Sequence, residues 1–294
     1  MPLPLGEMMK KIQIDVDGND VLIAHIFHAA PGKKRDRSVI VGPATAVPQT
    51  YYIKFCTYLA EQGFDVLSFD FRSVGQSLLR PIQEYRDIGF SDWAEHDYPA
   101  VVDFMHVQFP NQPLFIVGHS VGGWMPGATR VSHRIDGILG IAALSAYWPL
   151  MARPYRYGHW LTWNTLVPLT TNLLGYWPGW AGLTHDLPAK LGQEFAQWAQ
   201  LPGFLFDAPQ FNARGNAAKF TGHLHLYQIA DDAWGTTEAV SALQEHYPNA
   251  KSNVMETLKP SDFGAKSIGH LNFFRSVHRD TLWPHALARL TAFG

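Results

Sequence analysis

The stretch Pro113-Leu-Phe-Ile-Val-Gly-His-Ser-Val-Gly-Gly-Trp124 decides the fold of this chain. Its first part, Leu114 to Val117, is a short apolar run typical of a buried parallel strand. Residues 118–122 then match the pattern G-x-S-x-G, in which a serine occupies a sharp strand-to-helix turn between glycines. Such a turn holds the Ser120 hydroxyl clear of the sheet, because the glycines let main chain pass where a Cβ would clash. It also presents the Val121 N–H, at a helix N-terminus, as a donor for an oxyanion.

A G-x-S-x-G match is weak evidence when it stands alone, since an ordinary strand-turn-helix can carry the same pattern. A serine hydroxyl is a poor nucleophile at neutral pH and needs a base, and that base needs an orienting carboxylate. The meaning of the match therefore depends on whether the rest of the chain supplies a histidine and an acid in suitable places.

The composition describes an ordinary globular protein. The 294 residues are 47% hydrophobic and 16% charged, and the formal charge of −2 gives no reason to expect nucleic acid or an anionic membrane surface as a partner. The single cysteine, Cys56, excludes an intrachain disulfide and favours a reducing compartment. The N-terminus lacks signal-peptide features, and no run of about eighteen apolar residues occurs. We therefore expect a cytoplasmic protein without a membrane span.

The order of apolar runs predicts an α/β fold. An antiparallel hairpin comes first, with strands over residues 11–16 and 21–29 joined by the turn Asp17–Asp20. Short strands then alternate with helices, which is typical of a mostly parallel, doubly wound sheet with right-handed crossovers. The further strands are expected over residues 38–41, 65–69, 114–117, 135–144, 223–230 and 252–258. Helices are expected over about 49–62, 91–108 and 121–131. A further helix is expected after Thr236, ending near residue 246, and a last one from residue 269 onward.

The alternation of strands and helices stops within residues 148–219. This segment carries six tryptophans, is interrupted by prolines, and has helical patterns near 159–172 and 189–200. A stretch this long between two core strands predicts an insertion, and in this architecture insertions lie over the active site. We therefore expect an α/β core made of residues 1–147 and 220–294, covered by an aromatic-rich helical cap.

Two other strand ends carry informative residues. The loop after the strand over 38–41 reads Gly42-Pro-Ala-Thr-Ala46, and a tight small-residue turn can aim a backbone N–H at the serine. We assign this second oxyanion donor to Ala44. After the next strand, Asp70 and Arg72 are predicted to form a structural ion pair beneath the serine turn. His119, inside that turn, is expected to pack and hydrogen-bond without a catalytic role.

An acid and a histidine occur at two later strand ends, in the order serine, acid, histidine that this fold requires. Asp231 and Asp232 follow the strand over 223–230, and His270 follows the last strand. Three separate strand ends thus each deliver a residue type that nucleophilic catalysis by Ser120 needs.

Four segments resemble the α/β-hydrolase superfamily, and within it the predicted cytosolic hydrolases related to monoglyceride lipase and serine aminopeptidases. They are Asp70–Ser77, Gly118–Gly123, Asp231–Trp234 and Ile268–His270, the last followed by Phe273-Phe-Arg275. The resemblance extends over nearly the whole chain and implies Ser120 as nucleophile and His270 as base. The family acid usually stands three residues before a small or valine position followed by proline. Gly235 and Thr236 stand there for Asp232, so the resemblance implies Asp232 as the acid and Asp231 as a neighbour.

Two positions depart from the family pattern. Ser73 stands where the family usually has glycine, and Gly42-Pro-Ala44 stands where it has His-Gly. The first departure affects a turn, and the second bears on the oxyanion donor while leaving the triad intact.

The leading hypothesis is a carboxylesterase- or lipase-like serine hydrolase that cleaves a small-molecule carboxylic ester through an acyl-enzyme. The alternatives are an acyltransferase that uses the same intermediate, and a ligand-binding protein on a hydrolase scaffold. No cofactor or metal is implied. His223 and His225 share one strand face but lack a third ligand at suitable spacing. The first parallel strand is not followed by the G-x-G-x-x-G of a dinucleotide site.

Overall fold

The computed structural model describes residues 9–18, 20–181 and 183–293. Its main strands are β1 (Met9–Val16), β2 (Asp20–Phe27), β3 (Ser38–Gly42), β4 (Asp65–Phe69), β5 (Leu114–His119), β6 (Gly137–Ile141), β9 (His223–Ile229) and β10 (Ser252–Leu258). The helices outside residues 148–212 are α2 (Ile53–Glu61), α3 (Phe90–Asp92), α4 (Tyr98–Gln108), α5 (Val121–Ala128), α9 (Ala213–Ala217), α10 (Thr237–Gln244) and α11 (Leu282–Ala292).

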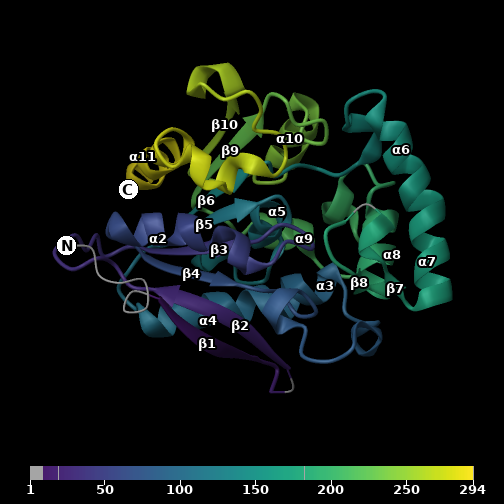
Figure 1. The fold of residues 1–294 in the computed structure, drawn as a ribbon, viewed down its shortest axis with the longest axis horizontal. Coiled ribbons are helices and arrows are strands. Elements are labelled where there is room, and N and C mark those ends of the chain that lie inside the picture. Colours follow the sequence, from purple (N-terminus) through teal and green to yellow (C-terminus); the bar gives the residue numbers. More distant parts are fainter. Residues whose placement is uncertain (1–8, 19, 182, 294) are drawn as a thin grey trace.

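The eight main strands form one twisted sheet in the order β1-β2-β4-β3-β5-β6-β9-β10 (Figure 1). Strand β2 pairs antiparallel with both β1 and β4, and the remaining neighbours are parallel. The predicted N-terminal hairpin and mostly parallel sheet are therefore confirmed. Because the carboxyl ends of parallel strands meet at one edge of a sheet, β3, β5 and β9 bring the loops that follow them together.

Alternating side chains of the buried strands feed two apolar layers. On β3, Val39 and Val41 pack on the side that holds α2 and α11, while Ile40 packs on the side of α4, α5 and α10. Such continuous apolar strands are expected where helices cover both faces of a parallel sheet. The layers fix the sheet rigidly beneath the loops at its edge.

Residues 148–219 lie between β6 and β9 in the chain, and we call them the intervening segment. It contains α6 (Tyr155–Leu161), α7 (Val167–Leu174), α8 (Ala189–Trp198) and a small antiparallel pair, β7 (Tyr176–Trp177) with β8 (Leu187–Pro188). A π-helical turn, Thr162–Leu166, joins α6 to α7. Figure 1 shows α6 and α7 end to end beyond one end of the sheet, with α8 beside α7.

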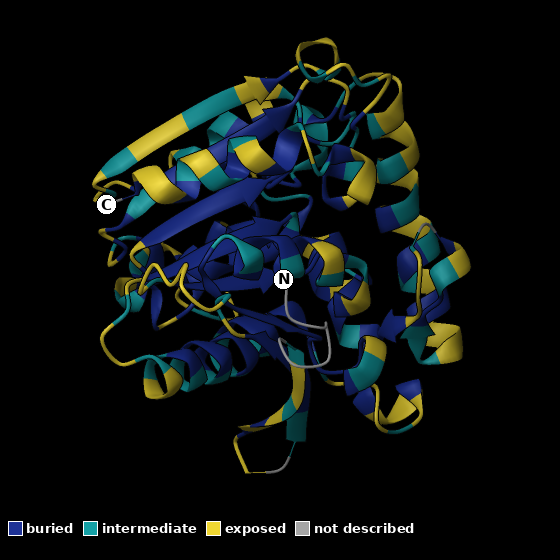
Figure 2. Ribbon diagram, turned by 60° about the vertical axis from the view of Figure 1, so that its left-hand side comes forward, coloured by how far each residue is buried: buried dark blue, intermediate teal, exposed yellow. Residues whose placement is uncertain are grey.

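Burial follows this layering. Figure 2 shows the central strands buried and the outward faces of the surrounding helices exposed. Across residues 9–18, 20–181 and 183–293, every helix is too short or too polar to cross a lipid bilayer.

The predicted ion pair between Asp70 and Arg72 is wrong. The Arg72 guanidinium instead pairs with Asp97, 2.5 Å from Nε to Oδ1, and with Asp20 at 3.5 Å. The Asp70 carboxylate accepts the backbone N–H groups of Gln49 at 2.6 Å and Gln76 at 2.9 Å. Backbone donors therefore satisfy Asp70, and the arginine finds its carboxylate on the turn before α4, a contact that sequence spacing does not reveal.

The predicted start of the C-terminal helix, at Gly269, is also wrong. Residues Asn272–Phe274 and Ser276–His278 form separate 3₁₀ turns, and the C-terminal helix α11 begins only at Leu282. His270 therefore lies in the loop before these turns and not in a helix.

Candidate active site

Ser120 lies at the tip of the turn between β5 and α5, with φ +52° and ψ −113°. Non-glycine residues rarely adopt such positive φ values, so the turn is strained and held by its surroundings. A Cβ on Gly118 would lie 2.1 Å from the Gly122 carbonyl oxygen, and one on Gly122 would lie 2.2 Å from the Gly42 carbonyl oxygen. The glycines of the motif are therefore required by close main-chain packing. The Ser120 N–H donates to the Ile141 carbonyl at 3.0 Å, which ties the turn to β6.

His270 and Asp232 meet at the same edge of the sheet. The His270 Nδ1 lies 2.7 Å from Asp232 Oδ2, and the other Asp232 oxygen accepts the Trp234 N–H at 2.9 Å. Burial works to raise the pKa of Asp232, but the charge of His270, its hydrogen bond and the N–H groups of Trp234 and Gly235 outweigh burial and lower that pKa. Asp232 is thus a buried carboxylate held ionised against the imidazole.

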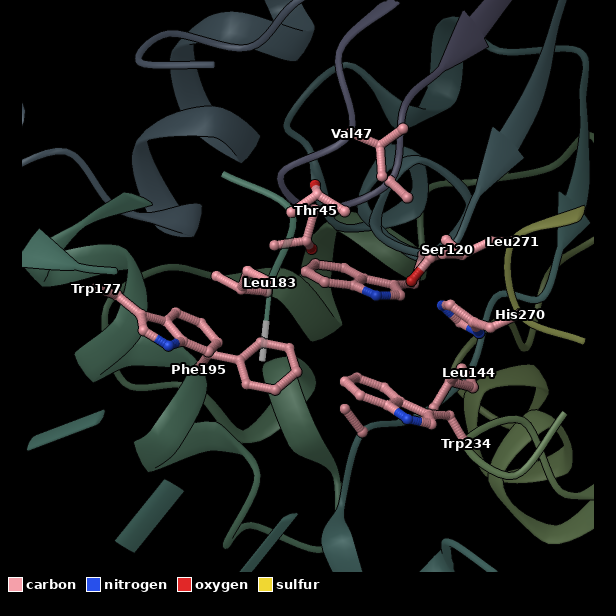
Figure 3. Close-up of a pocket in the computed structure, with 14 residues that line it drawn as sticks. Thr45, Val47, Ser120, Leu144, Trp177, Leu183, Phe195, Trp234, His270 and Leu271 are labelled. Atoms are coloured by element: carbon pink, nitrogen blue, oxygen red, sulfur yellow. The ribbon is translucent and has the colours of Figure 1, made fainter. Parts of the chain in front are cut away.

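Ser120 and His270 open onto one cavity of about 320 Å³. Figure 3 shows the Ser120 hydroxyl directed toward the His270 ring, with Trp234 below them and Phe195, Leu183 and Trp177 across the cavity. The lining residues are mostly apolar and comprise Ala44, Thr45, Val47, Ser120, Trp124, Leu144, Ala146, Trp177, Leu183, Thr184, Phe195, Trp234, His270 and Leu271. No Asp, Glu, Lys or Arg is among them.

The two predicted backbone donors differ in their surroundings. The Val121 N–H, in the first turn of α5, has no hydrogen-bond acceptor within the part of the chain that the structure describes. The Ala44 N–H is donated to the Tyr52 hydroxyl at 3.0 Å, so this contact opposes the assignment to Ala44. The next residue, Thr45, lines the cavity, and its N–H has no acceptor among the described residues. Sequence spacing could not reveal the Tyr52 contact.

His119 sits inside a chain of hydrogen bonds that joins three loops of the site. Its Nδ1 lies 2.7 Å from the Tyr52 hydroxyl, and its Nε2 lies 2.7 Å from the His270 carbonyl oxygen. Burial first, and then the nearby His270 charge, lowers the pKa of His119 to about 3. The neutral ring therefore carries its proton on Nε2, because a carbonyl only accepts, and Nδ1 accepts the Tyr52 proton. His119 packs and hydrogen-bonds, as predicted, and it also holds the main chain of His270.

Asp231 holds the loop before His270. Its carboxylate accepts the Ser267 hydroxyl at 2.6 Å, the Ile268 N–H at 3.0 Å and the Gly269 N–H at 2.9 Å. Burial acts to raise the pKa of Asp231, and these hydrogen bonds lower it overall. The pair of adjacent acids was visible in the sequence, but the partners of Asp231 come from a loop more than thirty residues away.

Each of the two strand histidines bonds a side chain of the neighbouring strand β10. His223 Nδ1 lies 2.8 Å from the Ser252 hydroxyl, and His225 Nε2 lies 2.8 Å from Glu256 Oε2. Within the described parts of the chain, no group of three or more His, Cys, Asp or Glu side chains is placed to hold a metal ion.

The fold and the site together define an α/β hydrolase. The family model described as serine aminopeptidase, S33, matches residues 34–206, more than half of the chain, and the chain belongs to this family. The comparison with curated proteins gave no match.

Solved structures share the fold at low sequence identity. A soluble variant of monoglyceride lipase from Saccharomyces cerevisiae, in complex with a substrate analogue, has TM-score 0.65 and 14% identity, over 96% of this chain and 94% of that one. Est1E from Butyrivibrio proteoclasticus, with ferulic acid bound, has TM-score 0.58 and 16% identity, over 95% and 99%. XC6422 from Xanthomonas campestris, a serine hydrolase without a lid, has TM-score 0.54 and 15% identity, over 98% and 96%.

Proposed function

We propose that this hydrolase cleaves a carboxylic ester with a neutral, apolar acyl group, through an acyl-enzyme on Ser120. The observation that carries the proposal is the opening of Ser120 and the His270–Asp232 pair onto one cavity free of charged side chains. Nucleophile, acid and base follow three strands in the chain order serine, acid, histidine of an α/β hydrolase.

In this proposal His270 Nε2 removes the proton of the Ser120 hydroxyl as the oxygen attacks the ester carbonyl carbon. Asp232 holds Nδ1–H and stabilises the imidazolium that forms. The tetrahedral intermediate then expels the alcohol, which takes the proton from His270. Water, activated by the same histidine, hydrolyses the acyl-enzyme and releases the acid.

The developing oxyanion needs donors that are already in place. We assign this role to the N–H groups of Val121 and Thr45, since neither has an acceptor among the described residues. Fixed donors of this kind contribute most where water is excluded, and loss of one costs about 10²- to 10³-fold in kcat. The Ala44 N–H is tied to Tyr52 and serves to hold the loop.

The lining of the cavity favours an ester over the N-terminus of a peptide. An enzyme that removes N-terminal residues must bind a free ammonium group, which in a buried site calls for a carboxylate partner. No Asp or Glu lines the cavity, whereas Trp124, Phe195 and Trp234 offer large apolar faces. An apolar acyl group gains from such burial at about 25 cal/mol per Å².

We also propose that the intervening segment, residues 148–219, acts as a cap on a core formed by residues 1–147 and 220–294. It supplies Trp177, Leu183, Thr184 and Phe195 to the cavity wall. The His185 ring also contacts the Ala46 carbonyl oxygen at 3.0 Å, so the segment reaches the loop that carries Thr45.

Hydrolysis of p-nitrophenyl esters tests the proposal, with wild type beside Ser120→Ala. We expect hydrolysis by the wild type and a loss of at least about 10⁴-fold in kcat for the variant, with its thermal unfolding little changed. A well-folded wild type that binds the esters without hydrolysing them would instead support the hypothesis of a ligand-binding protein. Turnover that requires an added alcohol or thiol would support acyl transfer.

A further inference from the structure

A second cavity lies in the intervening segment next to the one that holds Ser120. It measures about 370 Å³ and is lined by residues of α6, the π turn and β7, together with Trp234. We call it the outer cavity, and the one that holds Ser120 the inner cavity. Like the inner cavity, it has no Asp, Glu, Lys or Arg in its lining.

Three side chains, those of Trp177, Leu183 and Trp234, line both cavities. Figure 3 shows Trp177 and Leu183 across the inner cavity from Ser120, and Trp234 below His270. The two cavities therefore adjoin, with these three apolar side chains between them. A ligand held at Ser120 by its carbonyl group can reach the outer cavity only if it is long.

Of the polar side chains that line the outer cavity, which include Tyr155 and Thr162, His159 is the one held between aromatic rings. His159 is half-buried, its ring stacks on Trp163 at 5.3 Å, and it meets the edge of Trp234 at 4.4 Å. Neither ring nitrogen has a hydrogen-bond partner within the described residues. Burial lowers the pKa of His159, so the ring is neutral at physiological pH and offers one N–H donor and one acceptor.

Leu271, beside His270, is 41% exposed and lines the inner cavity, so this cavity reaches solvent close to His270. If the alcohol of an ester leaves through this opening, its acyl chain extends the other way, past Phe195 toward Trp177 and Leu183 (Figure 3).

We propose that the outer cavity is a second subsite for the far end of a long acyl chain, and that His159 binds a neutral hydrogen-bonding group, such as a hydroxyl, carried there. The inference rests on the proposed esterase activity and narrows its substrates to long-chain esters with an uncharged polar group near the chain end. His159 is a specificity residue in this account and takes no part in the bond-breaking steps.

Gly158 offers a way to fill the outer cavity without touching the inner one. It lines the outer cavity on α6, and a Cβ built there meets no atom within 4 Å. Gly158→Leu adds a large apolar side chain at the wall of the outer cavity and raises helix propensity. Gly158→Ala is the matched control, since it makes the same backbone change and adds only a methyl group.

Three p-nitrophenyl esters distinguish the subsites: the acetate, a laurate, and a laurate with a terminal hydroxyl. We expect Gly158→Leu to lower kcat/KM for both long esters by at least about tenfold, while the acetate and Gly158→Ala stay near wild type. His159→Phe keeps the stacked ring and removes the hydrogen bond. It should lower the preference for the hydroxylated laurate over the plain laurate by about two- to tenfold.

Binding of decanediol, followed by calorimetry, separates this inference from the esterase proposal. If wild type hydrolyses none of the esters, the proposed function fails, and weaker decanediol binding by Gly158→Leu still supports the second subsite. If the esters are hydrolysed and Gly158→Leu changes neither the long-chain rates nor decanediol binding, the second subsite is overturned. Equal rates for the two laurates in wild type and His159→Phe would overturn the role of His159.

Discussion

The edge of the sheet and the intervening segment contribute to the same cavity but are held in different ways. At the edge, Ser120, Asp232 and His270 are fixed by main-chain packing and by short hydrogen bonds to buried groups. In the intervening segment, by contrast, side chains are held by ring contacts: Trp163 meets Phe195 at 5.2 Å and meets Trp234, from the loop after β9, at 6.2 Å between ring centroids. Directional bonds define the positions of the proposed reacting atoms, and non-directional packing defines the space around them.

This difference assigns separate roles to the two regions. Proton transfer needs donor and acceptor atoms within hydrogen-bond reach, so small shifts at the edge of the sheet cost rate. An apolar wall can exchange one side chain for another of similar volume at modest cost. We therefore expect changes at the edge to act on kcat and changes in the intervening segment to act on the choice of substrate.

The largest expected effect at the edge comes from Asp232→Asn. The asparagine keeps the shape but favours the wrong tautomer of His270, because its amide nitrogen can donate to Nδ1. We expect kcat for p-nitrophenyl acetate to fall by about 10⁴-fold with KM little changed. A loss of less than tenfold, measured by steady-state kinetics, would mean that Asp232 does not orient the base.

Asp231→Asn is the matched change at the neighbouring position. An asparagine in place of Asp231 can accept fewer of the three donors from the loop before His270, so the loop is held less firmly. We expect kcat to fall by about 10- to 100-fold, with KM and the pH profile of kcat/KM unchanged, since the residue acts through position. Asp231→Glu should recover part of the loss. Equal losses of kcat in Asp231→Asn and Asp232→Asn would show that the two acids do not have the different roles proposed for them.

His119→Gln tests the buried hydrogen-bond chain through the pH dependence of stability. The unfolded chain binds a proton at this histidine below about pH 6.5, whereas the folded ring stays neutral down to about pH 3. Because the unfolded state binds more protons, the folded state of wild type loses up to about 1.4 kcal/mol per pH unit as pH falls through this window. The free energy of unfolding of His119→Gln should fall less steeply between pH 6 and 4, as measured by urea denaturation. Equal slopes would show that His119 is protonated in the folded protein.

Thr184→Val tests the contact between the two regions and should give the smallest effect. The Thr184 hydroxyl donates to the Ala46 carbonyl, in the loop that carries Thr45. We expect kcat for p-nitrophenyl acetate to fall by about two- to fivefold, because the loop loses one of the two hydrogen bonds that join it to the described part of the intervening segment. Thr170→Val is the control, since that hydroxyl bonds the Leu166 carbonyl within its own helix. Similar losses in both variants would point to general loosening of the segment.

The parts of the fold that follow from local rules could be predicted from the sequence. Alternating and apolar runs located the hairpin and the parallel strands, and the glycine spacing around Ser120 located the turn. The spacing of the family acid before a small residue indicated Asp232, and in the structure its carboxylate lies 2.7 Å from His270 Nδ1.

Contacts between distant segments could not be predicted in the same way. Arg72 finds Asp97, Tyr52 takes the Ala44 N–H, and Asp231 binds the loop before His270, all through side chains that only the folded sheet brings together. The outer cavity depends on how the helices of the intervening segment pack, whereas the sequence indicated helical stretches and many tryptophans but not their contacts.

Labelling with a fluorophosphonate, followed by mass spectrometry of the adduct, tests the central claim most directly. A serine activated by His270 and Asp232 reacts with this reagent, whereas an ordinary hydroxyl does not. The account predicts one adduct, on Ser120, formed by wild type, lost in Ser120→Ala and greatly slowed in Asp232→Asn. A folded wild-type protein that gives no adduct, or an adduct on another residue, would contradict it.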